Sequence, residues 1–373
     1  MKKQYFLMAM AATMFAACSQ TEVIDEVVDN STPKAIGFTT YTEGQTRAEN
    51  SGEVYADGLE EHHKNFKVWA YKDVSETKVF DNQLVTWNTN SWYYTPLRYW
   101  DKAALNYDFY AAAPAYRQDG STAIDWKLNK NADADHTDDF FTLSEFELFG
   151  VNLSTNTYDS RQNSWENSPT DIDLMIASPN QVGRAGFTST PVNLQFNHIL
   201  SRLNVTLYKA NILEDKNVVL KSIIIKGLKS KGSFNENADL GSDNLIGGTT
   251  KRWETESNTC DIKLVDDYIV EENTGIKNYV IQSLVIPQTS TFEDLDLNGT
   301  GSKTQPYFII TYKIGDEEFV AYYNLSNAFN VSPLAFNEGW ENTLNITIQP
   351  TAITFEAEVA EWDEKHNKDL TIE

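Results

Sequence analysis

Short apolar runs in which every second residue is hydrophobic recur along almost the whole of this 373-residue chain. They are rich in β-branched and aromatic residues and are separated by Asn, Asp, Gly, Ser and Pro, which favour turns. The clearest examples lie at 192–196 (VNLQF), 203–208 (LNVTLY), 344–348 (LNITI) and 353–359 (ITFEAEV). Because a period of two sends alternate side chains to opposite faces of a strand, the pattern predicts an all-β fold of antiparallel sheets packed as β-sandwiches, with little helix.

Three stretches carry more specific predictions. Residues 172–177 (IDLMIA) are apolar almost without a break, which is typical of a strand buried on both faces. The two runs in 307–324 are joined by Gly315-Asp316, which predicts a hairpin. One short helix or turn is expected at 139–149, where three large apolar residues have helical spacing: Phe140, Leu143 and Phe146.

The length of the chain is sufficient for two domains, each with a full-sized core. The stretch 178–191 is rich in Pro, Gly, Ser and Thr, so we place the linker there. The predicted domains are 35–195 and 196–373. A net charge of −24 makes nucleic acid an improbable partner, because contacts with phosphate require a basic patch.

The first 17 residues have the form of a lipoprotein signal peptide. Lys2 and Lys3 precede an apolar run at 5–17, and Cys18 follows two alanines directly. We expect cleavage before Cys18 and attachment of lipid, including palmitate, to its thiol. The alternative is an ordinary secretory signal with an incidental cysteine. A lipid on Cys18 would leave Cys260 without a partner for a disulfide, since the chain has only these two cysteines.

The segment after Cys18 combines a tether, a strand and a loop. Residues 18–34 are polar and acidic and predict a flexible tether. A short β-type run follows at 35–41, and then a polar loop that contains Arg47. Arg47 is the only basic residue between Lys34 and Lys64, so it is a distinct target for a trypsin-like protease.

Residue patterns typical of catalysis are missing from the sequence. It contains no HExxH, GxSxG, P-loop or GxGxxG motif, so we expect no enzymatic activity, no cofactor and no metal. An acidic stretch with Asp133 and Asp135 resembles a crude calcium loop but lacks the Gly and Glu of an EF-hand, and we favour a solvated loop. His198 is expected to make a structural hydrogen bond near the domain junction.

Aromatic residues are concentrated in the first domain: Trp87, Trp92, Tyr93, Tyr94, Trp100, Trp126 and Trp165. Exposed tryptophans can stack on sugar rings, which would suit a monomeric glycan-binding lipoprotein of the cell surface. We favour the interpretation that most of these residues fill the core, because aromatic side chains supply large buried areas.

Several of these stretches, in order, resemble one family. They are RYW (98–100), YDFYAAAP (107–114), DLMIA (173–177), VNLQFNHILSRLNVTLY (192–208), LVIPQ (284–288), NEGWENTLNITI (337–348) and FEAEVAEWDE (355–364). Together with a signal peptide that is followed directly by a cysteine, these stretches resemble the fimbrillin (Mfa-like) family of Bacteroidales surface lipoproteins. The resemblance covers nearly the whole mature chain.

The resemblance implies two tandem transthyretin-like β-sandwich domains and a subunit of a type V pilus with a role in adhesion to host or bacterial surfaces. It further implies an outer-membrane lipoprotein anchored at Cys18. An Arg-specific protease would cut after Arg47, the first strand at about 35–46 would leave, and a segment of another fimbrillin subunit would take its place.

The physics of such an exchange depends on how firmly the first strand is held. Ile36 and Phe38 share one face and Tyr41 lies on the other, so the strand offers few anchors, and we expect it to be held largely by its covalent attachment. The candidate donor is the apolar row of Ile353, Phe355, Ala357 and Val359, which is equally consistent with a permanent core strand. The tail 363–373 is the other candidate.

Overall fold

A computed structural model describes residues 34–42, 65–73, 77–88, 91–117, 122–130, 139–147, 173–183, 191–238, 252–257, 259–270, 279–290, 306–329, 334–350 and 353–361. These residues form β-strands almost throughout, with one turn of 3-10 helix at Asn211–Leu213 and one short α-helix, α1 (Leu325–Phe329). The all-β prediction is confirmed.

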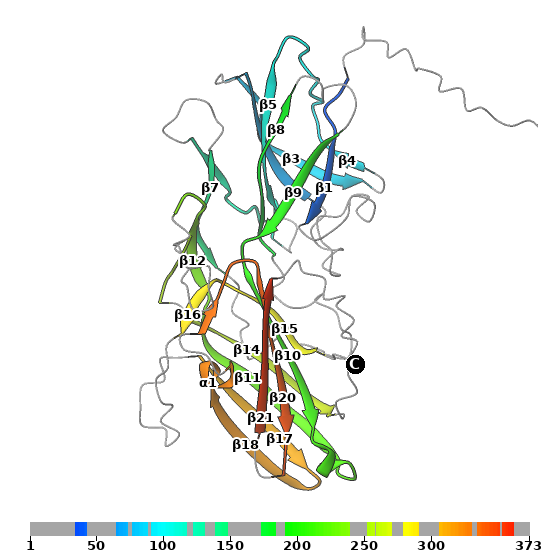
Figure 1. Ribbon diagram of the computed structural model, residues 1–373, viewed down its shortest axis with the longest axis vertical. Helices are drawn as coiled ribbons and strands as arrows, with labels where there is room; N and C mark the ends of the chain where they lie inside the picture. Colours follow the sequence, from blue (N-terminus) through cyan, green and yellow to red (C-terminus); the bar gives the residue numbers. More distant parts are fainter. Residues whose placement is uncertain are drawn as a thin grey trace, which may run out of the picture. The chain divides into compact units, whose positions relative to one another are not determined.

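The largest sheet has seven strands and belongs to the first half of the chain (Figure 1). Its order is β1 (Phe38–Thr42), β9 (Val192–His198), β8 (Met175–Gly183), β5 (Asn106–Ala113), β2 (Asn65–Lys72), β3 (Lys78–Asn88) and β4 (Ser91–Tyr93). A four-stranded sheet packs on one of its faces and consists of β13 (Trp253–Thr255), β12 (Lys231–Asn235), β7 (Phe140–Glu147) and β6 (Lys127–Asn129).

The second half of the chain builds a sandwich from two further four-stranded sheets. One consists of β15 (Tyr279–Val285), β10 (Ser201–Lys209), β20 (Trp340–Ile348) and β21 (Ile353–Glu361). The other consists of β14 (Thr259–Ile269), β11 (Val218–Lys229), β17 (Tyr307–Ile314) and β18 (Glu317–Asn324). A small pair is formed by β16 (Gln288–Ser290) and β19 (Leu334–Phe336).

Alternation in the sequence becomes alternation in burial. In β10 and β20 the apolar sets Leu203, Val205, Leu207 and Leu344, Ile346, Ile348 enter one core, where they meet side chains of β11 and β17. The hairpin expected at Gly315 joins β17 to β18, and Gly315 has a positive φ of 62°, which glycine adopts without strain. Both predictions are confirmed.

The middle strands of the seven-stranded sheet are buried on both faces. Residues 174–177 of the run around β8 are at most 2% exposed, as the unbroken apolar sequence predicts. Met175 and Ala177 face the core that contains Phe38, whereas Leu174 and Ile176 face the core that contains Phe141. The strand therefore separates two cores.

The prediction of a short helix or turn at 139–149 is wrong, because the described part of this stretch contains strand β7. Phe141 and Leu143 alternate into the core, and a β-bulge then shifts the phase by one residue, so that Phe146 also points inward. Glu145 at the bulge has a φ of 51°. A period of two interrupted by one extra residue therefore imitates helical spacing.

The expectation of purely antiparallel sheets is also corrected. β1 pairs with β9 in parallel, and β10 pairs with β20 in parallel. The boundary between the predicted domains stays a prediction. Strands β7 and β12, which lie on opposite sides of it in the sequence, pair with each other.

Candidate functional site: the β1 seam

The first described segment, 34–42, joins two parts of the seven-stranded sheet that lie far apart in the sequence. Its beginning pairs with the segment after β4: the amide of Ile36 donates to the carbonyl of Arg98 (2.9 Å), and the amide of Trp100 donates to that of Lys34 (3.1 Å). Its end, β1, runs parallel beside β9, from Phe38 opposite Val192 to Thr42 opposite Phe196 (Figure 1). β1 therefore closes a seam between β9 and the segment 94–100, which we call the β1 seam.

The side chain of Phe38 is the main apolar anchor of β1. It is 6% exposed and makes edge-to-face contacts with four rings at centroid distances of 5.6–6.1 Å, those of Phe66, Phe80, Tyr94 and Phe109. Such pairs add to the free energy gained from burial alone. Ile36 is 1% exposed in the same core. Both side chains occupy slots that would stand open without β1.

Two aromatic side chains, Trp92 of β4 and Tyr94 directly after it, hold the segment 34–42 through polar atoms. The hydroxyl of Tyr94 donates to the carbonyl of Ile36 (2.7 Å), and the indole Nε1 of Trp92 donates to Oγ1 of Thr40 (3.2 Å). Burial raises the pKa of the Tyr94 hydroxyl, so it remains protonated and able to donate. Both bonds lie where water has little access, which makes their loss costly.

Some of these contacts were not predicted from the sequence. The sequence named Ile36 and Phe38 as anchors, and the structure confirms that both are buried. Trp92, Tyr94 and Thr40 were not recognised as partners of β1, because the pairing of 34–36 with 98–100 is a long-range feature. The segment 34–42 is therefore bonded to β9 through β1 and to residues 98–100 through 34–36, which is more than a weakly held strand would have.

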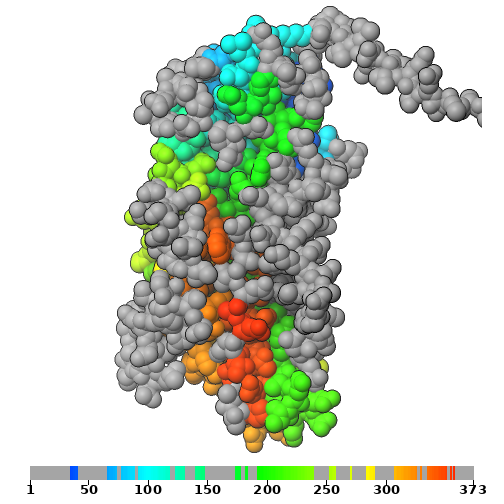
Figure 2. Space-filling view, viewed as in Figure 1, coloured from blue at the N-terminus to red at the C-terminus, as the bar shows by residue number. Residues whose placement is uncertain are grey.

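The candidate donor row lies on β21, at one edge of the sheet β15-β10-β20-β21. β21 pairs with β20 from Ile353 opposite Ile348 to Glu361 opposite Trp340. Ile353 is buried in the core and Ala357 is exposed. The face drawn in Figure 2 shows β20 and β21 at the surface, in orange and red. The side chains of Phe355 and Val359 lie outside the described set.

Other predicted site residues also fall outside the described residues. These are Cys18, Arg47, the side chain of Tyr41, Asp133, Asp135, Trp165 and four of the five histidines. Among the residues that the structure does describe, no group of three or more His, Cys, Asp or Glu side chains could hold a metal ion. Within the same residues, no helix has the length and apolar character needed to cross a membrane.

The aromatic residues of the first half are mostly core material. Trp92, Trp100 and Trp126 are at most 8% exposed, and Tyr94 is 4% exposed. Trp87 is partly buried against the same core, while Tyr93 is 51% exposed. The interpretation of these residues as core is confirmed for the buried ones, and their indole faces are not available to stack on sugars.

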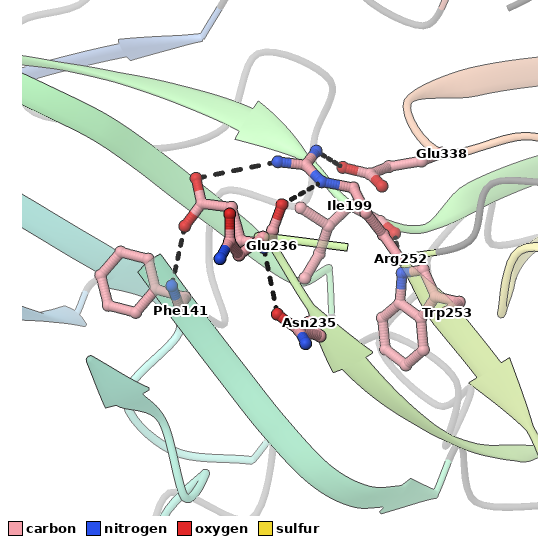
Figure 3. A network of polar contacts seen from close by, with 8 residues as sticks. Phe141, Ile199, Asn235, Glu236, Arg252, Trp253 and Glu338 are labelled. Carbon is pink, nitrogen blue, oxygen red and sulfur yellow. Dashed lines mark hydrogen bonds and ion pairs between the residues drawn. The ribbon is translucent and has the colours of Figure 1, made fainter. Parts of the chain in front are cut away.

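A partly buried polar network lies where β7, β12, β13 and the turn before β20 meet (Figure 3). Arg252 donates from Nη1 to Oε1 of Glu338 (2.8 Å) and from Nε to the carbonyl of Glu236 (3.0 Å). The carboxylate of Glu236 accepts the amide of Phe141 (2.8 Å). One guanidinium thus faces two carboxylates, and burial raises the pKa of Glu338 to about 7.

His198 is buried near this network, and its expected structural hydrogen bond stays a prediction. Its Nδ1 is 2.8 Å from Oδ2 of Asp173, and both side chains are buried. The neighbouring backbone is fixed by the amide of Ile199, which donates to the carbonyl of Leu174 (2.9 Å). Trp253 donates from its indole Nε1 to the carbonyl of Ile199 (2.7 Å), so β13 is tied to the same point.

Several known proteins are similar to this chain in sequence or in structure. A fimbrium subunit, Fim1C of Phocaeicola vulgatus, is 24% identical over 418 aligned positions that cover 100% of both chains. A solved fimbrial protein from Bacteroides vulgatus is 18% identical with a TM-score of 0.43, over 88% of this chain and 99% of that one. The tip fimbrial protein Mfa3 from Porphyromonas gingivalis is 10% identical with a TM-score of 0.39, over 88% and 100%.

The TM-scores of these two solved structures are below 0.5, whereas the match to a family model extends over most of the chain. A family model described as fimbrillin-like matches residues 46–362, which is most of the chain. On that match, the chain belongs to the fimbrillin-like family.

Proposed function

We propose that this protein is a structural subunit of a cell-surface fimbria, assembled by exchange of β1 for a segment of another subunit. Its role is adhesion and not catalysis. Membership of the fimbrillin-like family supports the fimbrial role, as does the name of the Phocaeicola vulgatus relative, a fimbrium subunit. The exchange itself is argued from the β1 seam.

The observation that carries the proposal is the position of β1 in both the sequence and the sheet. It is an edge strand of the seven-stranded sheet, so it can leave without breaking any pairing between the other six strands. Arg47 follows Thr42 by five residues, so a cut after Arg47 separates β1 from the rest of the fold. Only non-covalent contacts then hold β1 in its seam.

The vacated seam would be unstable without a replacement. It would expose the backbone edge of β9 and the open slots of Ile36 and Phe38, and an unpaired edge with apolar slots invites strand addition. The candidate donors are β21, with its row of Ile353, Phe355, Ala357 and Val359, and the tail 363–373. β21 already pairs with β20 along its whole length, which favours a permanent role for it.

The membrane anchor completes the proposed cycle. The precursor is exported with signal peptide 1–17, carries lipid on Cys18 and reaches the outer membrane, with 18–34 as a tether. Cutting after Arg47 separates the lipidated segment from the rest of the chain. The subunit then joins the fimbria through its newly acquired strand.

The test uses three variants of the full chain in a cell that assembles fimbriae. Arg47→Ala should remove the cut and prevent high-molecular-weight ladders that resist SDS, whereas Arg117→Ala, a matched arginine outside the β1 seam, should leave them intact. Cys18→Ala should release the protein from the membrane fraction. Unchanged ladders in Arg47→Ala would contradict cutting at this site, and a chain that stays monomeric after the cut would contradict assembly.

A further inference from the structure

The contacts of β1 differ in how much they depend on sequence. Any extended chain in register could make the backbone bonds with β9. The same holds for the bond from the Ile36 amide to the Arg98 carbonyl and for the bond from the Tyr94 hydroxyl to the Ile36 carbonyl, because both use backbone groups of the strand. The slots of Ile36 and Phe38 accept any large apolar side chain of suitable shape. The bond from Trp92 Nε1 to Thr40 Oγ1 is different, because it requires a side-chain acceptor at one defined position.

Thr40 and Trp92 meet in a place that excludes water. Thr40 is 2% exposed and Trp92 is 8% exposed. A second polar side-chain contact of β1, from Thr39 Oγ1 to Asn193 Oδ1 (3.2 Å), is only partly buried, so water can replace it. A buried indole N–H that loses its acceptor is far more costly than an exposed group.

Trp92 is held in place by residues other than β1. Its ring packs against Phe66 of β2 (centroid distance 4.8 Å) and against Trp87 of β3 (5.3 Å). Its strand pairs with β3, with Trp87 opposite Trp92. The indole N–H therefore keeps its direction when β1 leaves and is presented to the strand that enters.

We infer that Trp92 selects the incoming strand in the proposed exchange: a segment of another subunit with two large apolar residues two positions apart and a Ser or Thr two positions further on. This inference rests on the proposed function. The segment 34–42 itself has this pattern in Ile36, Phe38 and Thr40. Trp92 is thus a specificity-determining residue for assembly, in addition to its place in the core.

The pattern discriminates between possible donors. The β21 segment of a second copy carries Ile353 and Phe355 with the spacing of Ile36 and Phe38, but Ala357 stands where Thr40 stands. An alanine offers no acceptor, so the indole N–H would be buried without a partner. A subunit whose donor carries Ser or Thr at this position should therefore be preferred over a second copy's β21.

The test measures how peptides compete for the seam. The full chain is given a site-specific protease sequence in place of residues 44–49, cut, and incubated with a labelled peptide of residues 34–42. Unlabelled Thr40→Val peptide should compete about tenfold less well than the natural one, because valine keeps the shape but lacks the oxygen. Thr40→Ser should stay within about threefold. A peptide of residues 352–360 should gain about tenfold from Ala357→Thr.

The control is the same series on the Trp92→Phe chain, where the natural and Thr40→Val peptides should compete equally. If that variant fails to fold, the Trp92 indole N–H resonance of the natural chain provides the readout. It should be protected from hydrogen exchange by the natural peptide and less so by Thr40→Val.

Three results would overturn the inference. Equal competition by the natural and Thr40→Val peptides on the natural chain contradicts selection by Trp92 while leaving strand exchange intact. A tenfold difference that persists in Trp92→Phe assigns the selection to another residue. Failure of every peptide to enter the seam, even in mild denaturant, contradicts strand exchange itself and this inference with it.

Discussion

Phe38 is the residue through which β1 is coupled to the core. Its four edge-to-face ring contacts belong to β2, β3, β5 and the segment after β4. Phe38→Ala should therefore lower the free energy of unfolding by about 3–5 kcal/mol, measured by chemical denaturation. Leu105→Ala is the matched control, because Leu105 is 67% exposed and should change stability by less than about 0.5 kcal/mol. Equal effects of the two substitutions would contradict this role for Phe38.

Glu338 makes stability depend on pH. Its pKa of about 7 in the fold, set first by burial, lies above its ordinary value of 4.5, so the folded state holds the proton more tightly than the unfolded state. The stabilisation is fully present below about pH 4.5 and is lost as the pH rises through 7, a change on the order of 3 kcal/mol. The attraction of Arg252 opposes this shift and the repulsion of Glu236 adds to it.

Glu338→Gln should flatten the dependence of the unfolding free energy on pH between 5 and 7, because glutamine does not titrate and can still accept the bond from Arg252. Denaturation curves at pH 5, 6, 7 and 8 measure the difference from the natural chain. Glu254→Gln, at an exposed position of β13, should leave the dependence unchanged. Parallel curves for the natural chain and Glu338→Gln would show that this carboxyl does not titrate in the range.

At the scale of elements, the segment 34–42 is held by residues 98–100 at its beginning and by β9 at its end, so cutting alone should not release it. After a cut following Arg47, we expect the N-terminal fragment to remain bound during gel filtration in native buffer and to separate in mild denaturant. The reason is that the bonds to Arg98, Trp100 and β9 survive the cut. The same cut in Phe38→Ala should release the fragment without denaturant. Immediate release from the natural chain would show that the covalent link holds the strand.

The bulge in β7 gives a second prediction about an element. Glu145 has a φ of 51°, which glycine adopts at no steric cost. The side chain of Glu145 is 75% exposed, so its salt bridge to Lys231 contributes little to stability. Glu145→Gly should therefore raise stability by about 0.5–1 kcal/mol. Glu147→Gly, at an exposed strand position without positive φ, should lower stability by a similar amount. A loss of stability in both variants would contradict relief of strain at the bulge.

At the scale of the whole molecule, pairing between β7 and β12 joins early and late parts of the chain. The core around Phe141 and Phe146 includes Phe234 and Trp253, and the Arg252 network reinforces it. A chain cut by an engineered protease site within 184–190 should therefore run as one species in native gel filtration. Separation of the two pieces would show that these contacts do not hold them together.

Much of the fold follows from local sequence. Alternation in 192–196, 203–208 and 344–348, the continuous run at 174–177 and the turn at Gly315 each specify a strand or hairpin through nearby residues. The error at 139–149 is informative: the bulge at Glu145 depends on pairing with β12, about 90 residues further on, so the local period was ambiguous. The two parallel pairings join residues that lie still further apart in the sequence.

The sequence by itself determined that this chain is all-β, that it has an acidic surface, and that Ile36 and Phe38 would be buried, because these depend on side-chain chemistry and a period of two. Only the tertiary structure decided that the segment 34–42 would pair with both β9 and residues 98–100. It also decided that the indole N–H of Trp92 would donate to Thr40. Residues separated by some 50–150 positions meet there, and their contact depends on how the whole sheet curves and pairs, which no local pattern records.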